Sequence, residues 1–293
     1  MQISRSSAGS EIRWGLLLRA LIYSVLAFWL LPKWLSPPVQ ALSKAWHLGG
    51  LTAGNTALFE ALLLLIALLL TWTLGLYERR RVDGYGLPVR QAFGRRFWEG
   101  FALGVISAGA VAGGMLLLGG MQIHGLAIHG ATLLWAALAW LGANLLVGLA
   151  EEYWFRGYLM QTLWKAVGFW PAAVLIALWF AAAHYFFKAG ENVWDVITLL
   201  SGSIWLCYTL RQTGSLWLAV GWHAAFDFMQ FFVIGTPNGG VIPARHLLDA
   251  TFHGPRWLTG GVLGTEASFL MYPLIALMFL YVWRRKFARS ADA

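Results

Sequence analysis

The feature that most constrains this chain is a series of long apolar runs separated by short polar segments. Hydrophobic residues make up 59% of its 293 residues and charged residues only 12%, whereas a soluble domain averages about a quarter charged residues. A helix needs about 20 mainly apolar residues to span a bilayer. The runs predict eight spanning helices, at about 14–31, 57–76, 98–119, 131–155, 171–187, 193–210, 215–234 and 263–283. We therefore predict an all-α, polytopic membrane helix bundle.

The first apolar run, WGLLLRALIYSVLAFWLL at 14–31, has two interpretations. Arg13 precedes it and VQA at 39–41 resembles a cleavage site, as in a signal peptide. Its length, its tryptophans and Arg19 favour an uncleaved membrane anchor. We place the stretch 38–50 at the membrane interface rather than across the bilayer.

The positive charges predict the orientation of the bundle. The 77–97 loop carries six arginines, and both ends of the chain are basic. Short basic loops remain in the cytoplasm, and eight spans place both termini on the side of that loop. We therefore expect a multi-pass protein of the cell's inner membrane with both termini cytoplasmic. Because the basic residues flank apolar runs, the net charge of +8 does not indicate nucleic-acid binding.

We expect one membrane domain with two parts. Residues 1–97 hold N-terminal helices and the basic loop, and residues 98–293 hold the core helices. The Gly- and Pro-rich segment 235–262 predicts a long loop, like the shorter segment 122–130. In the helix at 98–119, small residues recur at four-residue spacing and predict close helix packing in lipid: Gly100, Gly104, Ala108 and Ala112.

Three groups of ionisable residues interrupt the later apolar runs. They are Glu151, Glu152 and Arg156 in EEYWFR, His184 in FAAAH, and His223 and Asp227 in HAAFD. A charged side chain in hydrocarbon costs roughly 2.5–3.5 kcal/mol, so each group needs a partner or a function. The rise of a helix places the three groups within about 8 Å of one another in depth. We expect them to share one inward-facing cavity that opens to the cytoplasm.

Two chemistries fit these residue types. A carboxylate beside an imidazole can hold and deprotonate a water, and a second histidine can donate to an oxyanion. Alternatively, Glu151, His184 and His223 can bind zinc and leave a position open for water. Both arrangements hydrolyse an amide inside the membrane. The only cysteine, Cys207, excludes an intrachain disulfide and a cysteine-based zinc cage.

The three motifs together resemble a known family. EEYWFR fits E-E-x-x-x-R, FAAAH fits F-x-x-x-H and HAAFD fits H-x-x-x-N/D. In this order, and mainly over residues 84–234, the chain resembles the CPBP intramembrane proteases. This is the CAAX protease and bacteriocin-processing (Abi) group, which includes the type II CAAX prenyl proteases.

The resemblance implies roles for the motif residues. Glu151 would activate water, His184 would help to hold it, and His223 with Asp227 would complete the site. Glu152 and Arg156 would support it. The CAAX members commonly have Asn where this chain has Asp227. An ionised Asp227 only accepts hydrogen bonds, so it would orient His223, bind a metal, or donate when protonated.

The resemblance also implies the substrate class, a membrane-associated or prenylated peptide. A zinc-dependent mechanism and a metal-free glutamate mechanism both remain open. Two other functions also remain open: a non-cleaving immunity or scaffold protein of the same family, and a proton-linked transporter. The sequence does not predict the oligomeric state.

Overall fold

The computed structural model describes residues 13–285 and residue 287. Within them, eight helical segments are long and apolar enough to cross a membrane. The predicted polytopic helix bundle is therefore confirmed. The segments are Trp14–Ala45, Ala53–Glu78, Arg95–Leu117, Gly130–Val167, Phe169–Phe186, Val193–Thr213, Trp217–Ile234 and Gly261–Arg284.

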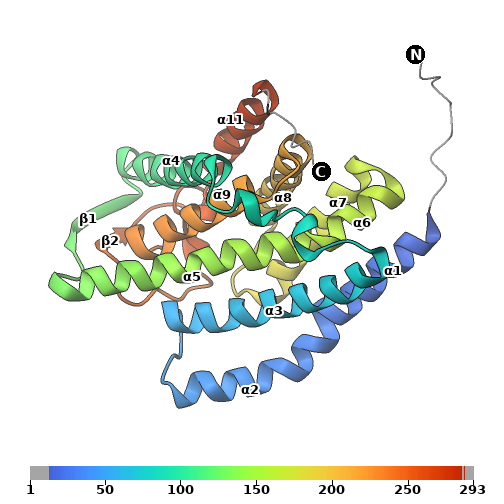
Figure 1. Ribbon diagram of the computed structural model, residues 1–293. Coiled ribbons are helices and arrows are strands. Elements are labelled where there is room, and N and C mark those ends of the chain that lie inside the picture. The colour runs from blue at the N-terminus through green and yellow to red at the C-terminus, as the bar shows by residue number, and fades with distance from the viewer. Residues whose placement is uncertain (1–12, 286, 288–293) are drawn as a thin grey trace.

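Eleven α-helices and two strands build these segments and their connections in the described residues (Figure 1). The helices are α1 (Trp14–Val25), α2 (Leu31–Ala45), α3 (Ala53–Glu78), α4 (Arg95–Leu117), α5 (Gly130–Arg156), α6 (Tyr158–Val167), α7 (Phe169–Phe187), α8 (Val193–Thr213), α9 (Trp217–Asp227), α10 (Arg256–Thr259) and α11 (Met271–Arg284). The strands are β1 (Met121–Leu126) and β2 (Leu248–Phe252).

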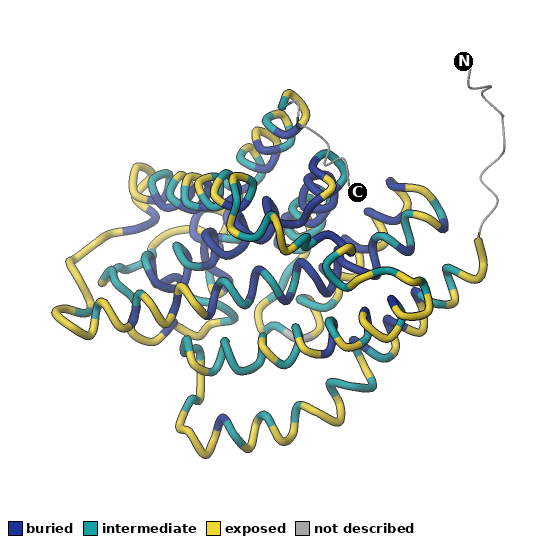
Figure 2. The backbone as a smooth tube through the Cα atoms, viewed as in Figure 1, coloured by how far each residue is buried: buried dark blue, intermediate teal, exposed yellow. Residues whose placement is uncertain are grey.

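Helix α9 lies at the centre of the bundle, between α4 and α5, and all of its residues are buried (Figure 2). Glycines allow the close approach on both sides. A Cβ at Gly104 of α4 would lie 2.4 Å from the carbonyl oxygen of Trp222, and one at Gly148 of α5 would lie 2.8 Å from that of Val220. Gly100 meets α9 in the same way one turn earlier. The packing role predicted for the small-residue stripe is therefore confirmed.

The first helix is longer than predicted. It continues from Trp14 to Ala45 through a π-helical turn at Leu26–Leu30, so residues 38–45 are helical rather than a separate interfacial stretch. Pro32 lies in the first turn of α2, where its missing N–H is tolerated, and the wide π turn precedes it. Helix α2 consequently bends away from the direction of α1 (Figure 1).

The fourth span contains a break that the sequence prediction missed. Helix α5 ends at Arg156, and Gly157 has a ψ of −113° before α6 begins. A Cβ at Gly157 would lie 2.3 Å from the carbonyl oxygen of Tyr153, so this turn requires glycine. The break places the E-E-x-x-x-R motif in the last two turns of α5.

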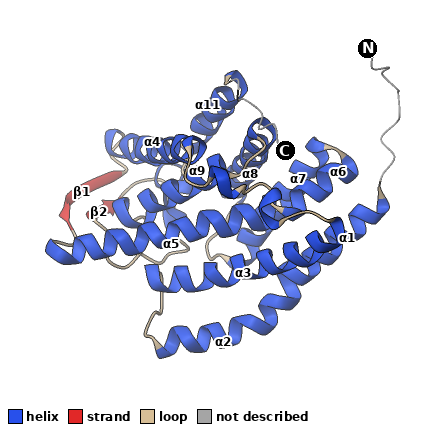
Figure 3. Cartoon of the chain, in the orientation of Figure 1, coloured by secondary structure: helices blue, strands red, loops and turns tan. Residues whose placement is uncertain are grey.

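The two segments predicted as loops, 122–130 and 235–262, contain the only sheet in the described residues (Figure 3). Strand β1 pairs antiparallel with β2, from Met121 opposite Phe252 to Leu126 opposite Leu248. This two-stranded sheet lies at the end of the bundle where α3 and α5 begin (Figure 3).

The basic loop lies at the opposite end and packs against the helices. The hydroxyl of Tyr153 donates to the carbonyl of Val82 at 2.8 Å. The N–H of Leu216 donates to the carbonyl of Gly86 at 2.7 Å. Because Leu216 immediately precedes α9, this contact fixes where the central helix begins.

Candidate active site

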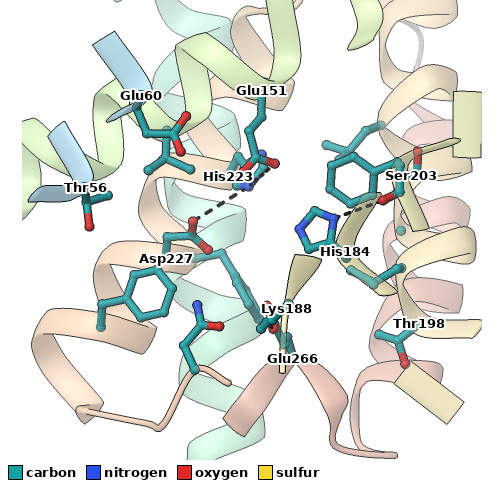
Figure 4. Close-up of a pocket in the computed structure, with 18 of the residues that line it drawn as sticks. Thr56, Glu60, Glu151, His184, Lys188, Thr198, Ser203, His223, Asp227 and Glu266 are labelled. Atoms are coloured by element: carbon teal, nitrogen blue, oxygen red, sulfur yellow. Dashed lines mark hydrogen bonds and ion pairs between the residues drawn. The ribbon is translucent and has the colours of Figure 1, made fainter. Parts of the chain in front are cut away.

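The ionisable residues of the three motifs come together from three helices. Glu151 lies near the end of α5, His184 near the end of α7, and His223 and Asp227 on one face of α9. All four line one cavity of about 350 Å³ (Figure 4). The expectation that these residues share one cavity is therefore met.

His223 is the centre of the polar contacts. Its Nδ1 lies 2.9 Å from Glu152 Oε1, a hydrogen-bond distance. Its Nε2 lies 3.7 Å from Glu151 Oε2 and 3.7 Å from Asp227 Oδ2. At that separation one water can bridge the imidazole and either carboxylate. The arrangement thus offers a water position between a base and a potential donor.

Glu152 and Arg156 lie behind His223 rather than in the cavity. Arg156 Nη1 is 3.3 Å from Glu152 Oε1, and both side chains are fully buried. Arg156 Nη2 also donates to Ser203 Oγ of α8 at 2.6 Å. This chain of contacts holds Glu152 against His223 Nδ1 and leaves Nε2 facing the cavity. The geometry is that of a supporting pair.

His184 uses one ring nitrogen for the backbone. Its Nδ1 lies 3.0 Å from the carbonyl oxygen of Phe180, one turn earlier on α7. A carbonyl only accepts, so Nδ1 carries the proton and Nε2 of the neutral ring is an acceptor. In this state His184 can hold a water by accepting from it, whereas donation to an oxyanion requires the protonated ring.

The cavity extends in a direction that differs from the prediction. Its lining includes Gly50 and Leu51, which precede α3, and Asn238, in the long loop after α9. These residues lie at the end of the bundle opposite the basic loop. We expected the cavity to open toward the basic loop, but it continues away from that loop.

A second, mainly apolar cavity of about 810 Å³ adjoins the first. Phe28, Trp29 and Pro32 of the first helix line it on one side. Glu151, His184 and Lys188 line both cavities. The candidate water position therefore lies between the first cavity and this second one, which we call the apolar groove.

The sequence prediction missed two groups of charged residues in the cavity. Glu60 of α3 lines it, and the signal was visible because Glu60 is the only charged residue between 53 and 77. Lys188 also lines it and forms an ion pair with Glu266, which lies far away in the sequence. No local pattern predicts that second pair.

The residues named for zinc do not form a ready metal site. Among the described residues, no three of His, Cys, Asp and Glu come together in a set that could hold a metal ion. His223 Nδ1 and His184 Nδ1 both contact protein oxygens, which leaves Nε2 of each ring as the atom that could bind a metal. Zinc binding by Glu151, His184 and His223 therefore remains a prediction for metal measurements.

A family model described as type II CAAX prenyl endopeptidase Rce1-like matches residues 133–229. That segment is similar to this family. It contains all six motif residues, and the resemblance inferred from the motifs is therefore confirmed over this part of the chain. The match excludes α3 and with it Glu60. Comparisons with curated proteins and with solved structures found no significant match.

Proposed function

We propose that this protein is a CAAX-type intramembrane endopeptidase that hydrolyses a peptide bond of a membrane-associated or prenylated substrate. The observation that carries the proposal is the position of His223 Nε2, 3.7 Å from both Glu151 and Asp227 inside a cavity. A water bound there lies within reach of a carboxylate base. The similarity of residues 133–229 to an endopeptidase family supports the same reaction.

The proposed roles follow from the contacts of each side chain. Glu151 removes a proton from the water as it attacks the scissile carbonyl. His184 Nε2 accepts a hydrogen bond from that water, since its Nδ1–H is held by the backbone. His223, oriented through Glu152, donates from Nε2 to the developing oxyanion when it is protonated. Asp227 stabilises the protonated imidazole.

The adjoining apolar groove supports a lipid-modified substrate. Its first-helix side has aromatic and proline side chains beside the polar Lys33, Ser36 and Gln40, and the groove reaches Glu151 and His184 directly. Burial of a hydrocarbon chain there contributes roughly 0.8 kcal/mol for each CH₂ removed from water. A lipidated residue in the groove would place the neighbouring peptide bond beside the proposed water.

The membrane orientation is part of the proposal. The arginines of the 77–97 loop and the even number of spans support cytoplasmic termini in the inner membrane. Glu151 then lies five residues from the end of α5, or about 7.5 Å below that end of the helix. The cavity continues from there toward the opposite side of the membrane.

The test uses purified protein and a lipidated peptide with a single scissile amide. Replacing Glu151 by Gln keeps the size of the side chain and removes the base, so we expect a loss of about 10²–10⁴-fold in rate. Glu99→Gln is the control, because Glu99 pairs with Arg285 outside the cavity. A folded Glu151→Gln protein that cleaves at the wild-type rate would contradict the mechanism. Intact peptide with folded wild type would favour the scaffold alternative.

A further inference from the structure

A fourth helix brings a carboxyl group to the cavity that the family motifs do not include. Glu60 of α3 lines the cavity together with Thr56, one turn earlier on the same helix. Figure 4 shows the Glu60 side chain directed toward Glu151 and His223 from the α3 side. Glu60 lies outside the segment 133–229 that matches the family.

The carboxyl groups of the cavity outnumber the cations that contact them. Four carboxyl groups line it: Glu60, Glu151, Asp227 and Glu266. Glu151 and Asp227 share the single imidazole of His223, and Glu266 is paired with Lys188.

Glu60 differs from the other three in having no such partner. Among the described residues no cation forms an ion pair with Glu60, and its Oε2, like that of Glu151, is buried without a hydrogen-bond partner. Nearby carboxylates in a buried site cannot all be ionised, so at least one of them retains a proton. The proton belongs on the carboxyl group without a neutralising cation, which is Glu60. A neutral carboxyl group is both a hydrogen-bond donor and a proton donor.

We propose that Glu60 is the general acid of the reaction and protonates the leaving amine. The inference rests on the proposed peptidase function and adds a residue to it. Water attacks the carbonyl carbon while Glu151 takes one of its protons. The C–N bond then breaks as the nitrogen takes the proton of Glu60, which becomes a carboxylate. The proton held by Glu151 passes to Glu60 through water and restores both groups, so the net reaction consumes one water.

The need for such an acid follows from the leaving group. An amine cannot leave as an anion, whereas a thiolate can, because a thiol has a pKa near 8.5. Two substrates therefore separate the acid from the other groups: a lipidated peptide with a scissile amide, and the same peptide with a thioester at that bond. Both need water activated by Glu151, and only the amide needs the proton of Glu60.

The experiment compares both substrates across matched variants. Glu60→Gln should slow amide cleavage by about 10²–10⁴-fold and leave thioester cleavage nearly unchanged. Glu151→Gln should slow both. Glu60→Asp keeps the proton on a shorter side chain and should recover part of the amide rate. Glu78→Gln is the control on the same helix, since Glu78 accepts from Tyr85 and Tyr158 away from the cavity.

The outcomes distinguish the role of Glu60 from the proposed peptidase function. Wild type that cleaves neither substrate overturns the peptidase function and the inference with it. Wild type that cleaves both, with Glu60→Gln slowing both equally or slowing neither, overturns only the role of Glu60. Glutamine matches the size and neutrality of a protonated glutamate, and a thermal melt of each variant checks its fold. If Glu60→Gln does not fold, the ratio of amide to thioester rates in Glu60→Asp decides: an unchanged ratio refutes the acid.

Discussion

Replacement of Gly104 by alanine should separate α4 from α9 and so disturb the candidate site. The added Cβ would lie 2.4 Å from the carbonyl oxygen of Trp222 and 2.9 Å from the backbone nitrogen of Phe226. Ordinary contacts begin near 3.4 Å, so one helix must move by about 1 Å. The blocking atoms are backbone atoms of a fully buried helix and cannot rotate away. Overpacking of this kind costs about 1–3 kcal/mol.

The matched control lies on the same helix. A Cβ at Gly109 meets nothing within 4 Å, so Gly109→Ala should gain up to about 1 kcal/mol from helix propensity. Gly104→Ala has the same gain in helix propensity, but its overpacking opposes that gain. Its melting temperature in detergent should therefore lie several degrees below that of Gly109→Ala.

The same displacement should reduce activity, because His223 follows Trp222 directly on α9. A misplacement of about 1 Å can cost about 10²-fold in rate. The peptide cleavage assay measures this loss on the two alanine variants side by side. A Gly104→Ala protein that has the melting temperature of Gly109→Ala and cleaves at the wild-type rate would refute the close-packing argument.

Three further predictions concern two buried charges and the metal. Arg156→Met should lower the free energy of unfolding by about 3–5 kcal/mol, since it leaves Glu152 buried without its cation; denaturant titration in micelles measures this, and a neutral result would contradict it. Burial, with a contribution from neighbouring Asp195, raises the pKa of Glu191 to about 8 from 4.5. The folded state therefore holds the proton more tightly, and this stabilisation is complete below about pH 4.5 and is lost as pH rises through 8. Melting between about pH 5 and about pH 9 should show that decline, and Glu191→Gln should flatten it. Metal analysis of purified protein separates the two water-activating mechanisms; stoichiometric zinc, with activity lost on chelation, would overturn the metal-free mechanism.

The parts of the fold that the sequence predicts are those encoded by local composition. Each spanning helix is a run of apolar residues long enough to cross a bilayer, and this property needs no knowledge of distant contacts. The expectation that Glu151, His184 and His223 share one cavity rests on helix rise alone. The roles of these residues stay predictions, because geometry alone does not measure a reaction.

The parts that were missed depend on distant contacts or on single backbone angles. The pairing of Met121 with Phe252 joins segments far apart in the chain, and neither strand has a strong local pattern. The ion pair of Lys188 with Glu266 is equally remote in sequence. The turn at Gly157 depends on one ψ angle. Glu60 is a different case. It is a single charged residue in a long apolar run, which the sequence shows, but it lies outside the three motifs.

Residues 133–229 and the helices outside them should contribute differently to substrate specificity. Residues 133–229 contain the whole chain of contacts from Ser203 through Arg156 and Glu152 to His223, so the matched segment by itself orients the imidazole. Two parts of the surroundings come from outside that segment, namely Glu60 of α3 in the cavity and the groove wall of the first helix. Changes to the matched segment should therefore alter the chemistry of the water. Changes to the first helix should alter which lipidated peptide reaches it, at an unchanged rate for a small soluble substrate that does not use the groove.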